Sequence, residues 1–424
     1  MPNFSIPLSG LTAESTALSA IANNLSNQNT TGYKDTSVLF SDLFYQNLGT
    51  TGSGNPIQVG AGTKVGSMPS LFTQGSVSST GVPTDVAIQG SGFFAVQGTD
   101  GVVRYTRAGD FSELNNYLVT PSGQQVVGYP ATNGVVNTGA GLAPLQLGGG
   151  TISPPSQTAN VQLTVNLNAS SSTTDTPYST PIQIYDSLGA IHNLTATFTK
   201  TAANTWGYSL SIPATDLSAA GATGVLATGT LTFNGNGVLV GDTATTGGTV
   251  TGTLSNVTAI PINGLADGAS NMTFDWNVLD ASKTPVITQV AAPDSTTSLH
   301  QDGTSSGSLA SFSIGSDGII TGSFSNGKVQ ALGQIALASF SNNNGLQLNG
   351  DTDYSPTLAS GQAVVGVPGA GGLGTLSGGS LELSNVDIAT EFASLIVAQR
   401  GFESDAKAVT TFDQIIQDTI ALKQ

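Results

Sequence analysis

The chain has 424 residues, with 10 lysines and arginines against 26 aspartates and glutamates, which gives a formal net charge of −16. Only 8% of the residues are charged, against roughly 25% in ordinary soluble domains, and the chain has no cysteine. This acidic balance argues against a nucleic-acid or anionic-lipid surface as partner, and the lack of cysteine excludes disulfides and thiolate chemistry.

The first residues show neither the basic region nor the apolar region of a cleaved signal peptide, so we expect none. No run approaches the roughly 20 apolar residues of a membrane span, so we expect no membrane insertion.

A helix with one apolar stripe is predicted from about Leu11 to Asn27. Leu11, Leu18 and Leu25 fall seven residues apart, and Ile21 shares their face, while the opposite face is mostly Ser, Thr and Asn. Because a short helix with one apolar stripe is not stable alone in water, we expect it to pack on a partner.

The long middle of the chain is predicted to be antiparallel β structure. Short alternating runs are separated by turns rich in Gly, Ser, Thr and Asn, including the hairpin-type pair Asn133-Gly134. A glycine run at 148–150, followed by Pro154, indicates a boundary, and the chain should return near Pro293. We therefore expect an N-terminal helix (1–30), a less regular connector (31–72), an inner β domain (73–150 and 299–380), an inserted outer β domain (151–298) and a C-terminal helix (381–424).

The C-terminal segment from about Ser384 to Leu422 is predicted to be a long helix. Ser384 followed by Asp387 indicates its start. The pattern alone allows either an ordinary core helix or a coiled-coil partner for the N-terminal helix. Its stripe repeats at steps near three and four and includes Phe392, Leu395, Gln399, Phe402, Val409 and Ile416.

Signals for catalysis are poor. The two histidines, His192 and His300, lie far apart without ligand spacing, and we interpret each as a packed or turn residue. No nucleophile is paired with a base, so we expect no enzyme, no cofactor and no metal.

Two segments near the ends resemble the flagellar rod–hook family. The family's N-terminal helix and the turn after it are similar to two runs of this chain, IANNLSN at 21–27 and NTTGYK at 29–34. LELSNVD at 381–387 and VAQRGF at 397–402 are similar to its C-terminal helix, although Phe402 stands where Tyr is common. The resemblance implies that Asn23, Asn24, Asn27 and Arg400 take part in helix packing, and that Gly32, Tyr33 and Lys34 form the connection out of the helix.

The middle of the chain narrows this resemblance to the hook members. DVAIQGSGFFAV at 85–96 and YTRAGDF at 105–111 resemble the β domain of the family, and IYDSLGAIHNL at 184–194 resembles the outer domain inserted in hook proteins. The resemblance implies terminal helices that pair as a coiled coil in a curved, helical homopolymer, with other axial proteins (distal rod, hook cap, hook–filament junction) and the type III export apparatus as partners. A distal rod subunit and an extracellular adhesin or carbohydrate-binding module remain as alternatives.

Overall fold

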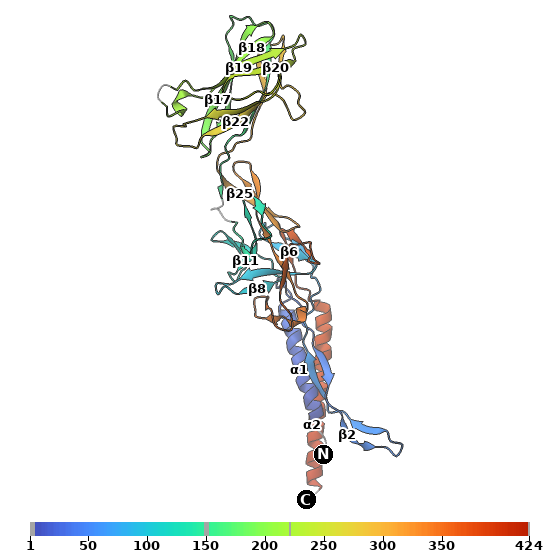
Figure 1. The fold of residues 1–424 in the computed structure, drawn as a ribbon. Helices are drawn as coiled ribbons and strands as arrows, with labels where there is room; N and C mark the ends of the chain where they lie inside the picture. The colour runs from blue at the N-terminus through green and yellow to red at the C-terminus, as the bar shows by residue number, and fades with distance from the viewer. Residues whose placement is uncertain (1–4, 148–151, 220–221, 423–424) are drawn as a thin grey trace. The chain divides into compact units, whose positions relative to one another are not determined.

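The computed structural model describes residues 5–147, 152–219 and 222–422, and Figure 1 shows its fold. The chain is mainly β and divides into two compact units. The first unit comprises residues 1–151, 310–323 and 329–424, and the second comprises 152–309 and 324–328. The second unit therefore continues past the expected return near 293–299, and the glycine run at 148–150 lies outside the described residues. None of the helices in the described part is long and apolar enough to cross a membrane.

Two helices, α1 (Ser5–Ser26) and α2 (Ile388–Ala421), lie side by side in the first unit. The predicted start of α1 at Leu11 is too late, because the first turn tolerates Pro7 and the Ser9 hydroxyl bonds the Ile6 carbonyl. The predicted start of α2 at Ser384 is too early. Asp387 is the N-cap and accepts a 2.9 Å hydrogen bond from the Thr390 amide.

The segment 31–72 contains two short antiparallel pairs. One pair, β1 with β4, lies against α1, where the Thr63 amide donates to the Ser9 hydroxyl at 3.1 Å. The other, β2 with β3, is a hairpin. Their bounds are β1 (Leu39–Asp42), β2 (Gln46–Thr50), β3 (Pro56–Val59) and β4 (Thr63–Ser67).

The β part of the first unit combines strands from before and after the second unit. In its main sheet β11 pairs with β27, where Gly128 is opposite Ile335, and the core includes Phe94, Val96 and Leu118. Asn133 and Gly134 both have positive φ in the two-residue turn between β11 and β12, which confirms the predicted hairpin. The strands are β5 (Val77–Ser79), β6 (Val86–Gln89), β7 (Phe93–Gln97), β8 (Val103–Thr106), β9 (Ser112–Leu114), β10 (Tyr117–Val119), β11 (Gln125–Thr132), β12 (Val135–Val136), β13 (Ala143–Pro144), β26 (Ile319–Phe324), β27 (Val329–Ile335), β28 (Leu337–Ser339), β29 (Gln347–Leu348), β30 (Asp353–Ser355), β31 (Val364–Gly366), β32 (Thr375–Gly378) and β33 (Ser380–Glu382), with β25 (Gly307–Ile314) entering from the second unit.

The second unit has two five-stranded sheets that share one core. Phe198 and Tyr208 from one sheet contact Trp276 from the other. The first sheet is antiparallel, in the order β16 (Tyr178–Tyr185), β17 (Ile191–Ala202), β18 (Thr205–Ser211), β19 (Val225–Phe233) and β20 (Leu239–Thr246). The second sheet contains β21 (Val257–Ile262), β22 (Met272–Asn277), β15 (Asn160–Asn168), β23 (Ile287–Val290) and β24 (Ser295–Gln301), and β14 (Ile152–Ser153) pairs with β25.

The prediction of purely antiparallel pairing is wrong for one strand. β15 runs parallel to both β22 and β23. Parallel neighbours need a long connection, and here the whole first sheet lies in the chain between β15 and its parallel partners.

Candidate assembly site at the terminal helices and their junction

The contact between α1 and α2 is made by small residues. Ala13, Ala17 and Ala20 of α1 are buried, as is Ala398 of α2. A Cβ added at Gly10 would overlap the carboxylate of Asp405, so this glycine allows that side chain to lie against α1. The helices therefore approach each other closely, within one chain.

The larger apolar residues lie at the edges of this contact. On α1, Leu11, Leu18, Ile21 and Leu25 are half-buried. On α2 the predicted stripe is divided between half-buried and exposed positions. Leu395, Phe402, Val409 and Ile416 are half-buried, whereas Phe392, Gln399 and Arg400 are exposed.

An apolar surface of α2 is left uncovered in the single chain. We call it the α2 apolar face, and it consists of Phe392, Ile396 and Val397. It lies beside a groove between the two helices, which Ile21 and Val397 both line. Large contiguous apolar patches on a protein surface are typical of association sites, so the α2 apolar face is a candidate for one.

The asparagines of α1 bind the turn that follows the helix. Asn24 is buried, accepts a 3.0 Å hydrogen bond from the Tyr33 hydroxyl, and donates to Asp35 and to Glu391 of α2. The Asn23 amide donates to the same Tyr33 hydroxyl at 3.0 Å. Asn27 stays within its own segment, where it donates to the Asn23 carbonyl and accepts from the Thr30 hydroxyl. Of these three asparagines, all within the described part of the chain, Asn24 is the one that hydrogen-bonds to α2.

Gly32 and Lys34 fix the exit from α1. Gly32 has φ of 67°, and a Cβ there would lie 2.5 Å from the Ala108 nitrogen, so only glycine fits without strain. Its amide donates to the Glu382 carbonyl at 2.8 Å. Lys34 is buried and places its Nζ 2.6 Å from Glu382 Oε1 and 2.8 Å from the Thr73 carbonyl. Burial lowers the pKa of Lys34, and the hydrogen bond to Glu382 opposes that shift.

Glu382 is the centre of a buried charge cluster. Its other oxygen, Oε2, accepts from Arg107 Nε at 3.0 Å and from a terminal guanidinium nitrogen at 2.7 Å. Arg107 also donates to the carbonyls of Gly90 and Gly92. One carboxylate thus pairs with two cations from distant parts of the chain, and both of its oxygens accept charge-assisted hydrogen bonds.

Asn385 adds a second link at the start of α2. Its Oδ1 accepts from the Asp35 amide at 2.8 Å, and its Nδ2 donates to the Leu71 carbonyl at 2.7 Å. We use the term "the junction" for Asn24, Lys34, Arg107, Glu382 and Asn385. It connects both helices to the β part of the first unit.

Sequence reasoning missed the roles of Arg107, Glu382 and Asn385. All three lie inside the segments that carried the family resemblance, at 105–111 and 381–387. Their presence in those segments was the only available signal, since nothing in the sequence pairs residues so far apart.

Family models match segments that include those at 105–111 and 381–387, and whole relatives match nearly the full chain. Two family models match the ends of the chain: "Flagella basal body rod protein" matches residues 6–34, and "Flagellar basal body rod FlgEFG protein C-terminal" matches residues 377–422. Two others match the middle: "Flagellar hook protein FlgE/F/G D1 domain" matches residues 87–170, and "Flagellar basal body protein FlaE D2 domain" matches residues 154–304. The flagellar hook protein FlgE of Salmonella typhimurium is 36% identical over 439 residues, covering 99% of this chain and 100% of the relative.

The chain belongs to the flagellar hook protein family. The Escherichia coli hook protein FlgE is 35% identical over 99% of this chain and 100% of its own length, and the Treponema pallidum hook protein is 33% identical over 98% of each. The hook-family resemblance of the sequence is therefore confirmed. The rod-family models match the segments that form α1 and α2 and the junction residues Asn24, Lys34, Glu382 and Asn385, whereas Arg107 lies in the segment that the FlgE/F/G D1 model matches.

Proposed function

We propose that this chain is the structural subunit of the flagellar hook, located in the hook outside the cell, and that it polymerises with copies of itself through α1 and α2. Family membership supports the hook assignment. The uncovered α2 apolar face supports the helix pair as the polymerising element. It is a structural subunit and not an enzyme.

In the polymer, neighbouring copies cover the apolar surfaces that a single helix pair leaves exposed. Ile415 and Ile420, further along α2, are exposed too and offer further apolar area to a neighbouring copy. Burying apolar area releases about 25 cal/mol per Å² and drives association without directional bonds. Leu11, Leu18, Ile21 and Leu25 complete the covered surface on α1.

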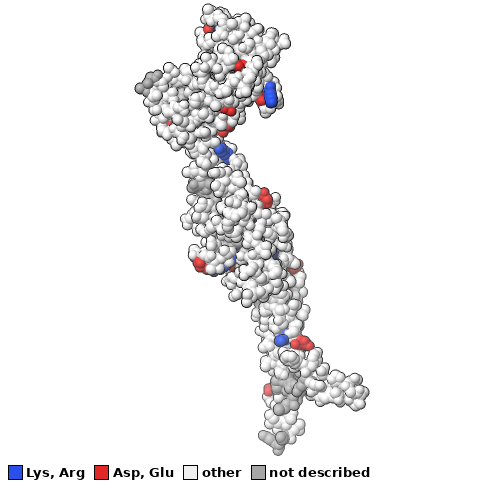
Figure 2. Space-filling model, in the orientation of Figure 1, with Lys and Arg blue, Asp and Glu red and all other residues white. Residues whose placement is uncertain are grey.

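The junction transmits load between the helices and the β part. The Lys34–Glu382–Arg107 cluster is buried and fully bonded, so the connection from helix to sheet is stiff. The polymer is a curved tube that carries torque from rod to filament. Figure 2 shows few charged atoms over the visible surface, which lets neighbouring surfaces slide without breaking ion pairs.

The partners that we propose follow from the same role. Distal rod, hook cap and hook–filament junction proteins contact the ends of the polymer, and the type III export apparatus delivers the subunit. Axial partners would use the helix pair, since the rod-family models match that part of the chain.

The test is polymerisation of the purified chain, observed by electron microscopy, with a matched pair of substitutions. Val397→Asp places a charge on the α2 apolar face, where Val397 is 72% exposed. Val135→Asp changes a valine of nearly the same exposure, 70%, on a hairpin. We expect curved tubes from the wild-type chain and Val135→Asp, and none from Val397→Asp with unchanged helical circular dichroism. Normal tubes from Val397→Asp would refute the helix-pair interface, and straight short tubes from the wild type would refute the hook.

A further inference from the structure

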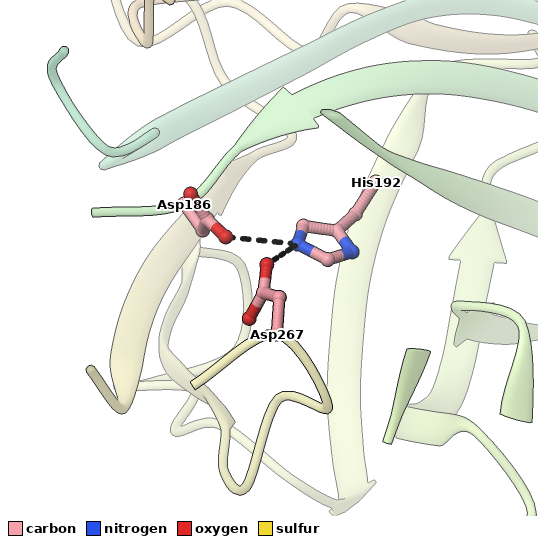
Figure 3. Close-up of side chains that lie close together, drawn as sticks. All are labelled: Asp186, His192 and Asp267. Atoms are coloured by element: carbon pink, nitrogen blue, oxygen red, sulfur yellow. Dashed lines mark hydrogen bonds and ion pairs between the residues drawn. The ribbon is translucent and has the colours of Figure 1, made fainter. Parts of the chain in front are cut away.

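Four titratable residues of the second unit meet around one imidazole ring. Asp186 follows β16, His192 lies at the start of β17, Asp216 ends a 3-10 helix (Ala214–Asp216), and Asp267 lies in the loop between β21 and β22. Asp186 and Asp267 point at the same ring nitrogen of His192 (Figure 3). Three carboxylates thus converge on His192.

The distances match the ligand shell of a small divalent ion. His192 Nε2 lies 3.2 Å from Asp186 Oδ2 and 3.7 Å from Asp267 Oδ2, and all three atoms lie within 4.8 Å of one another. In a tetrahedral zinc site with bonds of about 2.1 Å, two ligand atoms lie about 3.4 Å apart. An ion near the centre of this triangle would reach all three atoms after small side-chain adjustments.

Each of the three ligands is oriented by a contact that leaves its ligand atom available. Asp186 uses Oδ1 to accept from the amides of Leu188 and Ala190, at 2.8 and 2.9 Å. Asp267 uses Oδ1 to accept from the Ala269 amide at 3.0 Å. Asp186 and Asp267 therefore both turn Oδ2 toward the ring.

The histidine is oriented in the same way. Its Nδ1 lies 2.9 Å from Asp216 Oδ2, which places a carboxylate on the side of the ring opposite the other two. A histidine that ligates a metal through Nε2 commonly donates its other ring proton to a carboxylate, which fixes the tautomer and makes the ligating nitrogen more basic.

The negative charges around His192 also favour a bound cation. Three carboxylates face one ring, and the side chains of His192 and Asp186 are only 8% and 0% exposed. Among the residues that the structure describes, no lysine or arginine forms an ion pair with these carboxylates. Asp186 is the fully buried carboxylate, whereas the side chains of Asp216 and Asp267 are 23% and 32% exposed. A buried carboxylate without a counter-charge is costly, so Asp186 needs either a proton on the ring or a metal ion beside it.

We propose that Asp186, His192 and Asp267 bind one zinc ion, with Asp216 as a positioning residue behind His192. One imidazole and two carboxylates suit zinc, whereas calcium and magnesium prefer oxygen ligands alone. Waters would complete the coordination shell. The ion would tie together the ends of strands from both sheets, a structural role that is independent of polymerisation. The sequence alone predicted no metal, because only the fold brings the aspartates to His192.

The test is zinc titration of the full monomeric chain by isothermal calorimetry after removal of metals. With no cysteine and two histidines, the chain offers few competing sites. We expect one equivalent of zinc to bind, and calcium and magnesium to bind at least 100-fold more weakly. Asp267→Asn keeps the Oδ1 acceptor for Ala269 and should weaken zinc binding at least tenfold. His300→Gln removes the other, exposed histidine and should leave zinc binding unchanged.

Two further measurements keep the test decisive. Both tryptophans, Trp206 and Trp276, lie in the second unit, so their fluorescence reports whether Asp267→Asn and Asp216→Asn remain folded. Asp216→Asn should weaken zinc binding about 10–100-fold, as loss of a carboxylate behind a ligating histidine does. Long-range proton–nitrogen NMR should show zinc shifting the Nε2 signal of His192 alone. The proposal is overturned by absence of saturable binding, by equal binding in Asp267→Asn, or by a ring that stays doubly protonated in excess zinc.

Discussion

At the scale of single residues, Glu382 joins Lys34 and Arg107, which lie far from it in the sequence, and it was not among the site residues predicted from the sequence. It is fully buried and pairs with both Lys34 and Arg107. A buried carboxylate that holds two cations is expensive to remove, because two charges are left without a partner.

Glu382→Gln is expected to destabilise the first unit by about 3–5 kcal/mol, since Lys34 and Arg107 lose their counter-charge. Urea unfolding followed by circular dichroism at the helix band should show a lower midpoint. Tryptophan fluorescence, which reports only the second unit, should keep its midpoint. Glu113→Gln, on the exposed strand β9, is the matched control. An unchanged helix-band midpoint in Glu382→Gln would mean that the cluster is dispensable.

Glu391 gives the junction a pH dependence of a definite sign. Burial raises the pKa of Glu391, with the Asn24 hydrogen bond opposing the shift and Asp35 adding to it. Burial raises the pKa of Asp35 as well. A folded-state pKa above the unfolded value means that the stabilisation is complete below about pH 4.3, the ordinary glutamate pKa, and is lost as the pH rises through the raised value.

Glu391→Gln should therefore be as stable as the wild type near about pH 4 and more stable near about pH 7, because the glutamine stays neutral. The measurement is the urea midpoint of the helix band at both pH values. Glu403→Gln, on an exposed part of the same helix, should show no such divergence. A wild-type chain that gains relative stability toward neutral pH would contradict the assignment.

At the scale of elements, the helix pair is held by small residues at its centre. Alanine at positions 13, 17 and 20 allows α2 to approach closely, and Leu18 and Ile21 flank this contact. A seam of leucines, one of the contacts that a coiled coil could make, would keep the helices further apart.

Ala17→Leu should overpack this contact and destabilise the helix pair by about 1–3 kcal/mol. Ala22→Leu places the same side chain on the exposed face of α1 and serves as the control. Thermal unfolding by circular dichroism should separate the two variants. Equal melting temperatures would show that α1 and α2 are not packed through Ala17.

At the scale of the whole molecule, the chain leaves one unit, builds a second and returns. The return strands complete the sheet of the first unit, as the β11–β27 pairing shows. The final return segment then supplies Glu382 in β33 and Asn385 before α2 begins. The junction therefore depends on residues that precede the helix, and α2 itself is an addition to a complete β structure.

Two truncated chains should distinguish the contribution of α2 from that of the junction residues before it. A chain ending at residue 387 keeps Glu382 and Asn385 but lacks α2, and should be a soluble monomer that forms no tubes, with the β part of the first unit and the whole second unit folded. A chain ending at residue 381 loses both residues, and its first unit should unfold at much lower urea while the tryptophan signal is unaffected. Identical stability of the first unit in the two truncated chains would refute the central place of Glu382.

The sequence alone determined those features that depend on local chemistry. A period near 3.6 marked the two terminal helices, alternation marked the strands, and paired glycine and asparagine marked turns such as Asn133-Gly134. Gly32, placed by the sequence at the exit from the N-terminal helix, likewise has positive φ. Family resemblance supplied the hook assignment, which the relatives confirm.

Only the tertiary structure decided which distant residues meet. Lys34 and Glu382 are 348 positions apart, and Asp267 reaches His192 only through the closure of the second unit. The parallel neighbours of β15 were equally hidden. Periodicity indicates which side of a helix or strand is buried, but it does not indicate which distant residues pack against that side. The helices could therefore be predicted, whereas the small-residue contact, the junction and the carboxylate–histidine cluster required the packed fold.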